Sequence, residues 1–199
     1  MQAKRSLTNS LIAVITGAFL LGNGLNVFGT QYIAAIFPRF TEDFALLYGG
    51  QFSNGYFPGV STGEYWRLIT VALTHAGILH LASNMFCLWS FGPTLENYFG
   101  KARFAILFFG SLIAASAASV YLGPHNSFKV GASGAVFGLL GALLVISKKV
   151  GLNYQSIGST VVLNLIITFT IPNIDWRAHI GGLISGALLG YLLIFSKRT

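Results

Sequence analysis

Residues 129–141 read KVGASGAVFGLLG and place a serine among spaced glycines at the start of an apolar run. Ser133 follows Gly131 by two residues and directly precedes Gly134, and further glycines recur within the run. Small residues at such spacing let transmembrane helices approach one another closely. The Ser133 hydroxyl therefore serves either helix packing or chemistry, and the rest of the chain decides between the two.

The composition indicates a polytopic membrane protein. The chain has 199 residues, of which 54% are hydrophobic and 9% charged, and its mean hydropathy is +0.69. Soluble domains carry about 25% charged residues. The polar stretches leave no room for a separate soluble domain, so we expect one membrane domain over residues 1–199. The net charge of +7 lies in short clusters between apolar runs, without the basic stripe and interleaved aromatics that indicate nucleic-acid binding.

Six apolar runs predict an all-α bundle of six transmembrane helices in a lipid bilayer. The expected spans are residues 11–28, 78–98, 104–122, 132–147, 157–171 and 179–195. The first run approaches the roughly 20 residues needed to span and lacks a convincing cleavage site, so we interpret it as a retained span rather than a signal peptide. The connection over about 29–67 is rich in aromatics, which favours an interfacial loop with short amphipathic helices.

The distribution of basic residues predicts that both termini are cytoplasmic. With the amino terminus inside, eight lysines and arginines fall on the inside and four on the outside. The inside set is Lys4, Arg5, Lys101, Arg103, Lys148, Lys149, Lys197 and Arg198, and the outside set is Arg39, Arg67, Lys129 and Arg177. Cytoplasmic loops carry the excess of positive charge in membrane proteins.

Three polar side chains on different spans fall at one depth. Counting about 1.5 Å per residue from the cytoplasmic ends places Ser133 about 22 Å up, His80 about 24 Å and His179 about 27 Å. In a hydrocarbon core about 30 Å thick, they form one shallow layer below the outer surface. His179 heads a glycine stripe that includes Gly182 and Gly186, so packing of the fourth span against the sixth would put Ser133 beside His179.

Ser133 and His179 suit the roles of a nucleophile and its general base. A serine hydroxyl needs a base within hydrogen-bond reach, and imidazole titrates near neutral pH. The resulting oxyanion needs hydrogen-bond donors, which Asn84, His80 and the Ser133 amide can supply. His80 and Asn84 are four residues apart and therefore share a helix face.

A third triad member is not expected from the sequence. Glu96 is at the opposite end of its span, and Asp175 lies in a loop, so the residues predict a Ser-His dyad. Cys87 stands alone inside an apolar run and offers neither a disulfide nor a thiolate metal site. A metal site built from the histidines would lack an accompanying cluster of ligands.

Several motifs, in this order, resemble those of the rhomboid intramembrane serine proteases. The motifs are Trp66-Arg67 in the first loop, HLASN from His80 to Asn84, GASG around Ser133, and AHIGGLISG over residues 178–186. The resemblance implies a six-helix bundle with a cavity that opens to the outside, Ser133 as nucleophile, His179 as base, and His80 and Asn84 in the oxyanion hole. Supporting positions are expected at Gly131, Gly134, Phe137, Gly182, Gly186, Trp66 and Arg67.

The resemblance also implies a hydrolase of the inner (plasma) membrane that uses no metal or organic cofactor. It would cleave transmembrane protein substrates near the outer ends of their spans, with lateral entry past the fifth span. Phe137 departs from the family pattern, because many bacterial members have tyrosine there; its ring can stack on His179 but brings no hydroxyl. His75 and His125 are interpreted as polar loop or cavity-edge residues.

Two other functions fit parts of the sequence. An inactive rhomboid-like protein would bind transmembrane clients without cutting them, and loss of the serine or the histidine would mark it. A small transporter would use the histidines as a proton relay, and inverted halves or polar residues through the full membrane depth would mark it. Ser133 and His179 are both present, and the polar set stops in the outer third of the spans.

Overall fold

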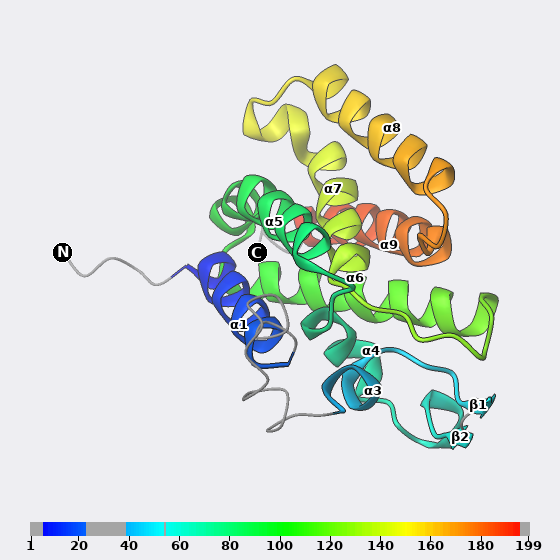
Figure 1. Ribbon diagram of the computed structural model, residues 1–199. Helices are drawn as coiled ribbons and strands as arrows, with labels where there is room; N and C mark the ends of the chain where they lie inside the picture. The colour runs from blue at the N-terminus through cyan, green and yellow to red at the C-terminus, as the bar shows by residue number, and fades with distance from the viewer. Residues whose placement is uncertain (1–5, 23–38, 54, 196–199) are drawn as a thin grey trace.

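Helices make up most of the described chain. The computed structural model describes residues 6–22, 39–53 and 55–195 (Figure 1). The long helices are α1 (Leu7–Gly22), α5 (Ile78–Phe99), α6 (Lys101–Leu122), α7 (Ser133–Ile146), α8 (Tyr154–Thr170) and α9 (Trp176–Phe195). The short elements are α3 (Phe40–Phe44), β1 (Gly50–Phe52), β2 (Gly55–Phe57), η1 (Val60–Thr62), α4 (Arg67–Thr70), η2 (Val71–Leu73) and η3 (Ser147–Val150). The predicted helical membrane bundle is confirmed.

Several helices are long and apolar enough to cross a membrane. By length and composition these are α6, α9 and the stretch Ser133–Val150, which joins α7 and η3. The segment Arg67–Leu73 and α5 qualify together as a pair bent by 102°. The apolar helix α1 is shorter, with 16 residues. The chain is therefore a multi-pass membrane protein, and the number of six spans stays a prediction.

Some helices begin before the predicted spans do. α6 begins at Lys101 rather than 104, α8 at Tyr154 rather than 157, and α9 at Trp176 rather than 179. We predicted each span from the start of its apolar run. A helix can begin earlier, because a polar first turn is also helical when a side chain caps its free N–H groups. The Asn153 side chain caps α8 by accepting hydrogen bonds of 2.8 and 3.2 Å from two backbone N–H groups. Residues 23–28 of the first predicted span lie outside the described residues.

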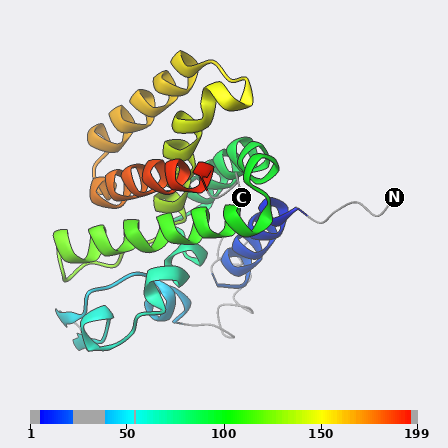
Figure 2. The ribbon, with the colours of Figure 1, turned by 180° about the vertical axis from the view of Figure 1, so that it is seen from behind.

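The helix that begins at Ser133 is at the centre of the bundle. α5 passes on one side of α7, and α6 and α9 pass on the other, as the front and rear views show (Figures 1 and 2). Most residues of α7 are buried, including Gly134, Phe137 and Gly138. Because α7 is apolar all round, it fits a position enclosed by other helices. The polar side chain of α7, Ser133, therefore lies at the N-terminal end of the helix.

Glycines bring α7 and α9 into backbone contact. A side chain at Gly182 would collide with the carbonyl oxygen of Gly134, and one at Gly186 would collide with that of Gly138. Such close approach is possible only where both helices lack a Cβ. The close packing of the fourth predicted span against the sixth is thus observed, and it carries the first turn of α9 to the start of α7.

The described part of the first loop contains a small hairpin as well as short helices. β1 and β2 pair antiparallel, with Gly50 opposite Phe57. Gly49 and Gly55 have φ angles of 110° and 132°, a region that side chains disfavour, so glycine permits the turns. We predicted short amphipathic helices in this loop and no hairpin. The two strands have three residues each. Residues 29–38 of the predicted loop lie outside the described residues.

The first loop is attached to the segment that precedes Ser133. Leu46 and Lys129 form an antiparallel bridge with two backbone hydrogen bonds of 2.9 Å. The Tyr48 ring stacks on the His125 ring, with centroids 3.8 Å apart. His125 is exposed and lies in the segment between α6 and α7, in keeping with its interpretation as a loop residue. These contacts fix the path of the chain into α7.

Glu96 on α5 holds the N-terminus of α1. Its carboxylate accepts hydrogen bonds from the Ser6 hydroxyl (2.7 Å), the Leu7 amide (2.7 Å), and the Thr8 amide and hydroxyl (2.9 and 2.7 Å). The first N–H groups of a helix have no partner within that helix, and a carboxylate there also meets the positive end of the helix dipole. A buried acidic side chain therefore ties α1 to α5 at the end of α5 far from His80.

Candidate active site

A glycine turn delivers Ser133 to the N-terminus of α7. Gly131 has a φ of 116°, which a residue with a side chain adopts only with strain. A Cβ at Gly131 would also lie 2.7 Å from the His80 ring, so glycine is required twice over. The turn places Ser133 as the first residue of α7, where backbone N–H groups are free of intrahelical partners.

The Ser133 hydroxyl is in hydrogen-bond contact with His179. The distance between Ser133 Oγ and His179 Nε2 is 2.9 Å. His179 comes from the first turn of α9 and is only 8% exposed. The two residues are 46 positions apart in the chain and meet because the glycine contacts draw α9 against α7. A serine and an imidazole at this distance are the arrangement that nucleophilic catalysis requires.

Phe137 covers one face of the His179 ring. The ring centroids are 4.1 Å apart and the planes differ by 15°. Phe137 lies one turn after Ser133 on α7, so the same helix supplies the hydroxyl and the stacking surface. The stacking expected from the sequence is present, and the aromatic ring offers no hydrogen bond to the imidazole.

Thr168 on α8 contacts the other nitrogen of His179, a role that we did not predict from the sequence. Its Oγ1 lies 2.8 Å from His179 Nδ1. The signal in the sequence was a series of polar residues four apart, Thr160, Asn164 and Thr168, which marks one face of α8. In an apolar helix such a face points inward, but hydroxyls that bond their own helix produce the same pattern.

Asn84 and His80 lie on α5 beside the Ser133 turn. Asn84 is buried, and its Nδ2 donates a 2.9 Å hydrogen bond to the His80 carbonyl oxygen. The amide carries a second N–H, which no hydrogen bond within the described residues uses. His80 Nδ1 accepts from the Ala76 amide at 3.5 Å, which leaves the ring proton on Nε2, next to Gly131. Their role as oxyanion donors stays a prediction.

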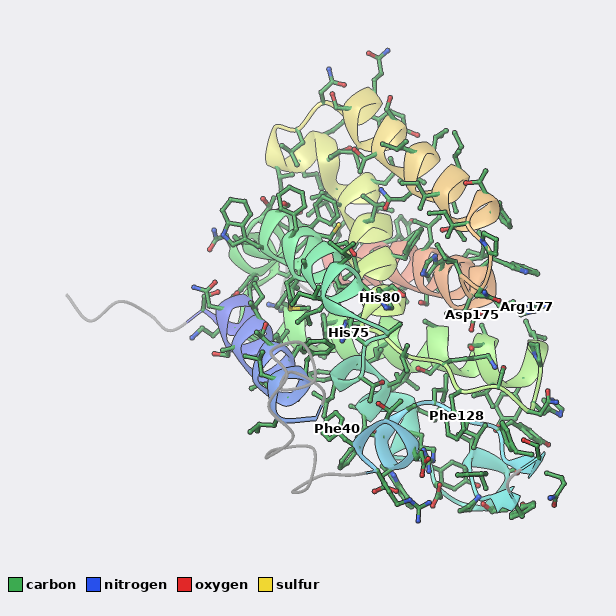
Figure 3. All side chains as sticks on the ribbon, viewed as in Figure 1. Phe40, His75, His80, Phe128, Asp175 and Arg177 are labelled. Carbon is green, nitrogen blue, oxygen red and sulfur yellow. The ribbon has the colours of Figure 1, made fainter. Side chains whose placement is uncertain are left out.

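His75 lies in the connection between η2 and α5, which agrees with its interpretation as a polar loop residue, but its side chain is buried. It is 3% exposed, and its Nε2 accepts a 3.5 Å hydrogen bond from the amide of Ala132, the residue before Ser133. Its ring meets that of His80 edge to face, with centroids 5.1 Å apart, and Figure 3 shows both rings at the end of α5 that begins at Ile78. The bend between η2 and α5 turns His75 inward, which the sequence pattern did not indicate.

Asp175 does not act as a third triad member in this geometry. Its carboxylate accepts from the Ser119 hydroxyl and from the amides of Arg177 (3.2 Å) and Ala178 (3.4 Å), so it caps α9 (Figure 3). Lys129 lies nearby, and burial lowers its pKa below the ordinary value, while the negative charge of Asp175 acts in the opposite direction. These groups hold the N-terminal end of α9.

Trp66 and Arg67 are away from the dyad and shape the first loop. Arg67 is 4% exposed, and its guanidinium donates to Glu64 (2.5 Å) and to the carbonyl oxygens of Glu42 (2.6 Å) and Ala45 (2.7 Å). Trp66 is half exposed, as an aromatic residue at a membrane interface would be. The site residues predicted from the sequence therefore divide into a central group around Ser133 and this distant loop support.

The family model described as Rhomboid domain matches residues 62–196 of this sequence. The match includes every residue of the central group, from His80 to Gly186. The chain belongs to the rhomboid family. The family predicted from the sequence motifs is thereby confirmed.

Several named rhomboid proteins are similar to this chain. The rhomboid protease GluP of Bacillus subtilis (strain 168) is 42% identical over 134 residues, which cover 64% of this chain and 26% of GluP. The putative rhomboid protease YdcA of the same organism is 38% identical over 150 residues, which cover 73% of this chain and 75% of YdcA. RHOMBOID-like protein 7 of Arabidopsis thaliana is 39% identical over 141 residues, which cover 68% of this chain and 45% of that protein.

These rhomboid relatives agree with the enzyme class expected from the sequence, a hydrolase of the serine protease type. The chain spans about a quarter of GluP, three quarters of YdcA and less than half of the Arabidopsis protein. Among the described residues, no group of three or more His, Cys, Asp or Glu side chains is arranged to hold a metal ion.

Proposed function

We propose that this protein is an intramembrane serine endopeptidase that cleaves transmembrane protein substrates with Ser133 and His179 as its catalytic dyad. The observation that carries the proposal is the 2.9 Å contact between Ser133 Oγ and His179 Nε2 at the end of a buried helix. Its support comes from family membership and from relatives that are named rhomboid proteases.

The first half of the reaction forms an acyl-enzyme. Ser133 Oγ attacks the carbonyl carbon of the substrate peptide bond while His179 Nε2 takes the hydroxyl proton. The oxyanion that develops accepts hydrogen bonds from the Ser133 amide, the second Nδ2 proton of Asn84 and the Nε2 proton of His80. His179 then gives its proton to the leaving amine, and the C–N bond breaks.

The second half restores the enzyme. His179 takes a proton from a water molecule, the resulting hydroxide attacks the ester carbonyl carbon, and the same oxyanion donors act again. The proton returns to Ser133 Oγ as the ester bond breaks and the acid product leaves. Each proton moves between named atoms of the dyad, the water and the substrate, so the cycle calls for no metal or organic cofactor.

The proposal includes the architecture and location expected from the sequence. Residues 1–199 form one rhomboid domain with six spans. The protein lies in the inner (plasma) membrane of the cell, with both termini in the cytoplasm and the active site open to the outside. The basic residues Lys101, Arg103, Lys148 and Lys149 are at the end of the bundle opposite Ser133, which supports this orientation. Substrates are transmembrane segments whose helix is weakened by glycine, proline or polar residues.

The alternatives lack an observation of their own. An inactive client-binding protein would not need a hydroxyl in hydrogen-bond contact with an imidazole. A transporter would need a polar path along the bundle, and α7 carries no polar side chain between Ser133 and its end at Ile146.

Cleavage of a single-span reporter in liposomes tests the proposal. Wild type should cut the reporter, Ser133→Ala and His179→Asn should not, and the three proteins should unfold at similar temperatures. Ser90→Ala is the matched control, because the Ser90 hydroxyl is exposed on α5 and donates to the Phe86 carbonyl oxygen, one turn back on the same helix. A fluorophosphonate should label wild type and not Ser133→Ala. Cleavage by Ser133→Ala at the wild-type rate would contradict the proposal.

A further inference from the structure

We propose that Thr168 is a positioning residue that holds His179 in the tautomer able to accept the proton of Ser133. This inference deepens the proposed protease function and rests on it. Its basis is a chain of hydrogen bonds that runs from the α8 backbone through Thr168 and His179 to Ser133.

The Thr168 hydroxyl lies between two partners. Its Oγ1 is 2.7 Å from the carbonyl oxygen of Asn164 and 2.8 Å from Nδ1 of His179. Thr168 is 3% exposed and His179 8% exposed, so water does not compete freely for either group. A buried hydroxyl between two partners must arrange its single proton to satisfy both.

The identity of the partners fixes the direction of each hydrogen bond. The Asn164 carbonyl oxygen can only accept, and two oxygens 2.7 Å apart need a proton between them. The Thr168 proton therefore goes to Asn164, and Thr168 presents a lone pair to His179. Nδ1 of His179 must then carry a proton and donate it to Thr168.

That direction sets the other side of the imidazole. A neutral imidazole has one proton, so Nε2 of His179 is unprotonated and turns a lone pair towards Ser133 Oγ at 2.9 Å. This is the tautomer that a general base requires. In the opposite tautomer Nε2 would be a donor, and it could not take the Ser133 proton.

Thr168 also keeps its contact after proton transfer. The imidazolium that forms has protons on both nitrogens, and its Nδ1 proton still has the Thr168 oxygen as acceptor. Hydrogen bonds from a charged donor are stronger than neutral ones, so Thr168 stabilises the state with the proton on His179. The carboxylate of Asp175 is already occupied by Ser119 and by the first amides of α9.

Thr168 and Phe137 hold the ring in different ways. Phe137 stacks on the ring face from α7, whereas Thr168 binds the ring edge from α8. Stacking allows the ring to turn in its own plane and does not distinguish the two tautomers. The hydrogen bond to Thr168 fixes the orientation of the ring in its plane and also its tautomer. Thr168 belongs to α8, which carries neither member of the dyad.

Kinetics of three variants test the inference in the liposome assay. Thr168→Val keeps the shape of the side chain and removes the hydroxyl, so kcat should fall about 10- to 100-fold with little change in KM. Thr168→Ser keeps the hydroxyl and should restore most of kcat. Thr170→Val is the matched control, because Thr170 is exposed on the same helix and its hydroxyl donates to carbonyl oxygens of that helix. Wild-type kcat in Thr168→Val would overturn the inference.

A nitrogen NMR spectrum of ¹⁵N-histidine-labelled protein separates this inference from the protease proposal. The His179 signals, identified by their loss in His179→Asn, should show a protonated Nδ1 and a bare Nε2 in wild type, and Thr168→Val should lose this preference. This readout needs no activity. A protonated Nε2 in the neutral wild-type imidazole overturns the inference, even if Thr168→Val does not fold. If the protein gives the expected spectrum but cuts no reporter, the hydrogen bond to Thr168 is supported and the protease proposal is contradicted.

Discussion

Phe137 and His179 stack with their ring centroids 4.1 Å apart and their planes within 15° of parallel. The stack comes from one turn of α7 below Ser133, so it holds the imidazole at the height of the hydroxyl. Aromatic pairs contribute about 0.5–1.5 kcal/mol beyond the area they bury, equivalent to about a 2- to 10-fold effect on a rate.

Phe137→Leu should therefore lower kcat about 2- to 10-fold, because leucine fills the space without a ring. Phe137→Tyr keeps the stack and should retain most of the activity. Steady-state cleavage of the reporter measures both variants. Equal rates for Phe137→Leu and wild type would show that the ring does not position the imidazole.

Asn84→Ala should lower kcat about 10²- to 10³-fold, the usual cost of losing one oxyanion donor. Ser83→Ala is its control: Ser83 also donates to the His80 carbonyl, at 2.9 Å, but it points outward from α5. A similar loss in both variants would mean that the helix backbone, and not the oxyanion, depends on these side chains. The measurement is kcat at saturating reporter.

Arg67→Met should destabilise the protein by about 3 kcal/mol, because it leaves the carbonyl oxygens of Glu42 and Ala45 and the Glu64 carboxylate without their donor. Arg67→Lys should recover only part of the loss, since an ammonium group lacks the planar fork of guanidinium. Reversible unfolding in detergent measures the difference. Arg39→Met, which breaks the exposed pair with Glu42, should cost about 1 kcal/mol or less. Equal losses at the two arginines would contradict this account of Arg67.

Glu96→Gln should destabilise the attachment of α1 by about 2 kcal/mol. The amide keeps one acceptor oxygen but turns an N–H group towards donors of Ser6, Leu7 or Thr8. The rate of cleavage per folded molecule should stay unchanged, because Glu96 is at the far end of α5 from His80. Unfolding in detergent and active-site titration measure the two quantities. A fall in kcat without a fall in stability would assign Glu96 a role that this geometry does not give it.

The sequence carried enough information to bring Ser133 and His179 together. Both fell at one calculated depth, and the glycines before and within their helices indicated which helices touch. Gly182 and Gly186 are informative because a missing Cβ has few explanations inside a membrane helix other than close packing. The family followed from the order of the motifs, and the family match confirmed it.

Thr168 and His75 could not be recognised in the same way. A threonine in an apolar helix ordinarily bonds the carbonyl four residues back, and Thr168 does so with Asn164. Its second contact depends on how α8 packs beside α9, which no local pattern records. His75 lies at the bend between η2 and α5, and only the angle of that bend turns its ring under Ala132.

The backbone contact between α7 and α9 limits how this protein can be engineered for stability. Replacing helical glycine with alanine ordinarily stabilises a helix by about 0.5–1 kcal/mol. At Gly182 and Gly186 the added methyl group would meet a carbonyl oxygen, which belongs to the backbone and cannot move aside. Among the residues that the structure describes, nothing lies within 4 Å of such a methyl group at Gly17 or Gly158. A thermostable variant for structural work therefore has to be sought on the outer helices α1 and α8, while the central pair keeps its glycines.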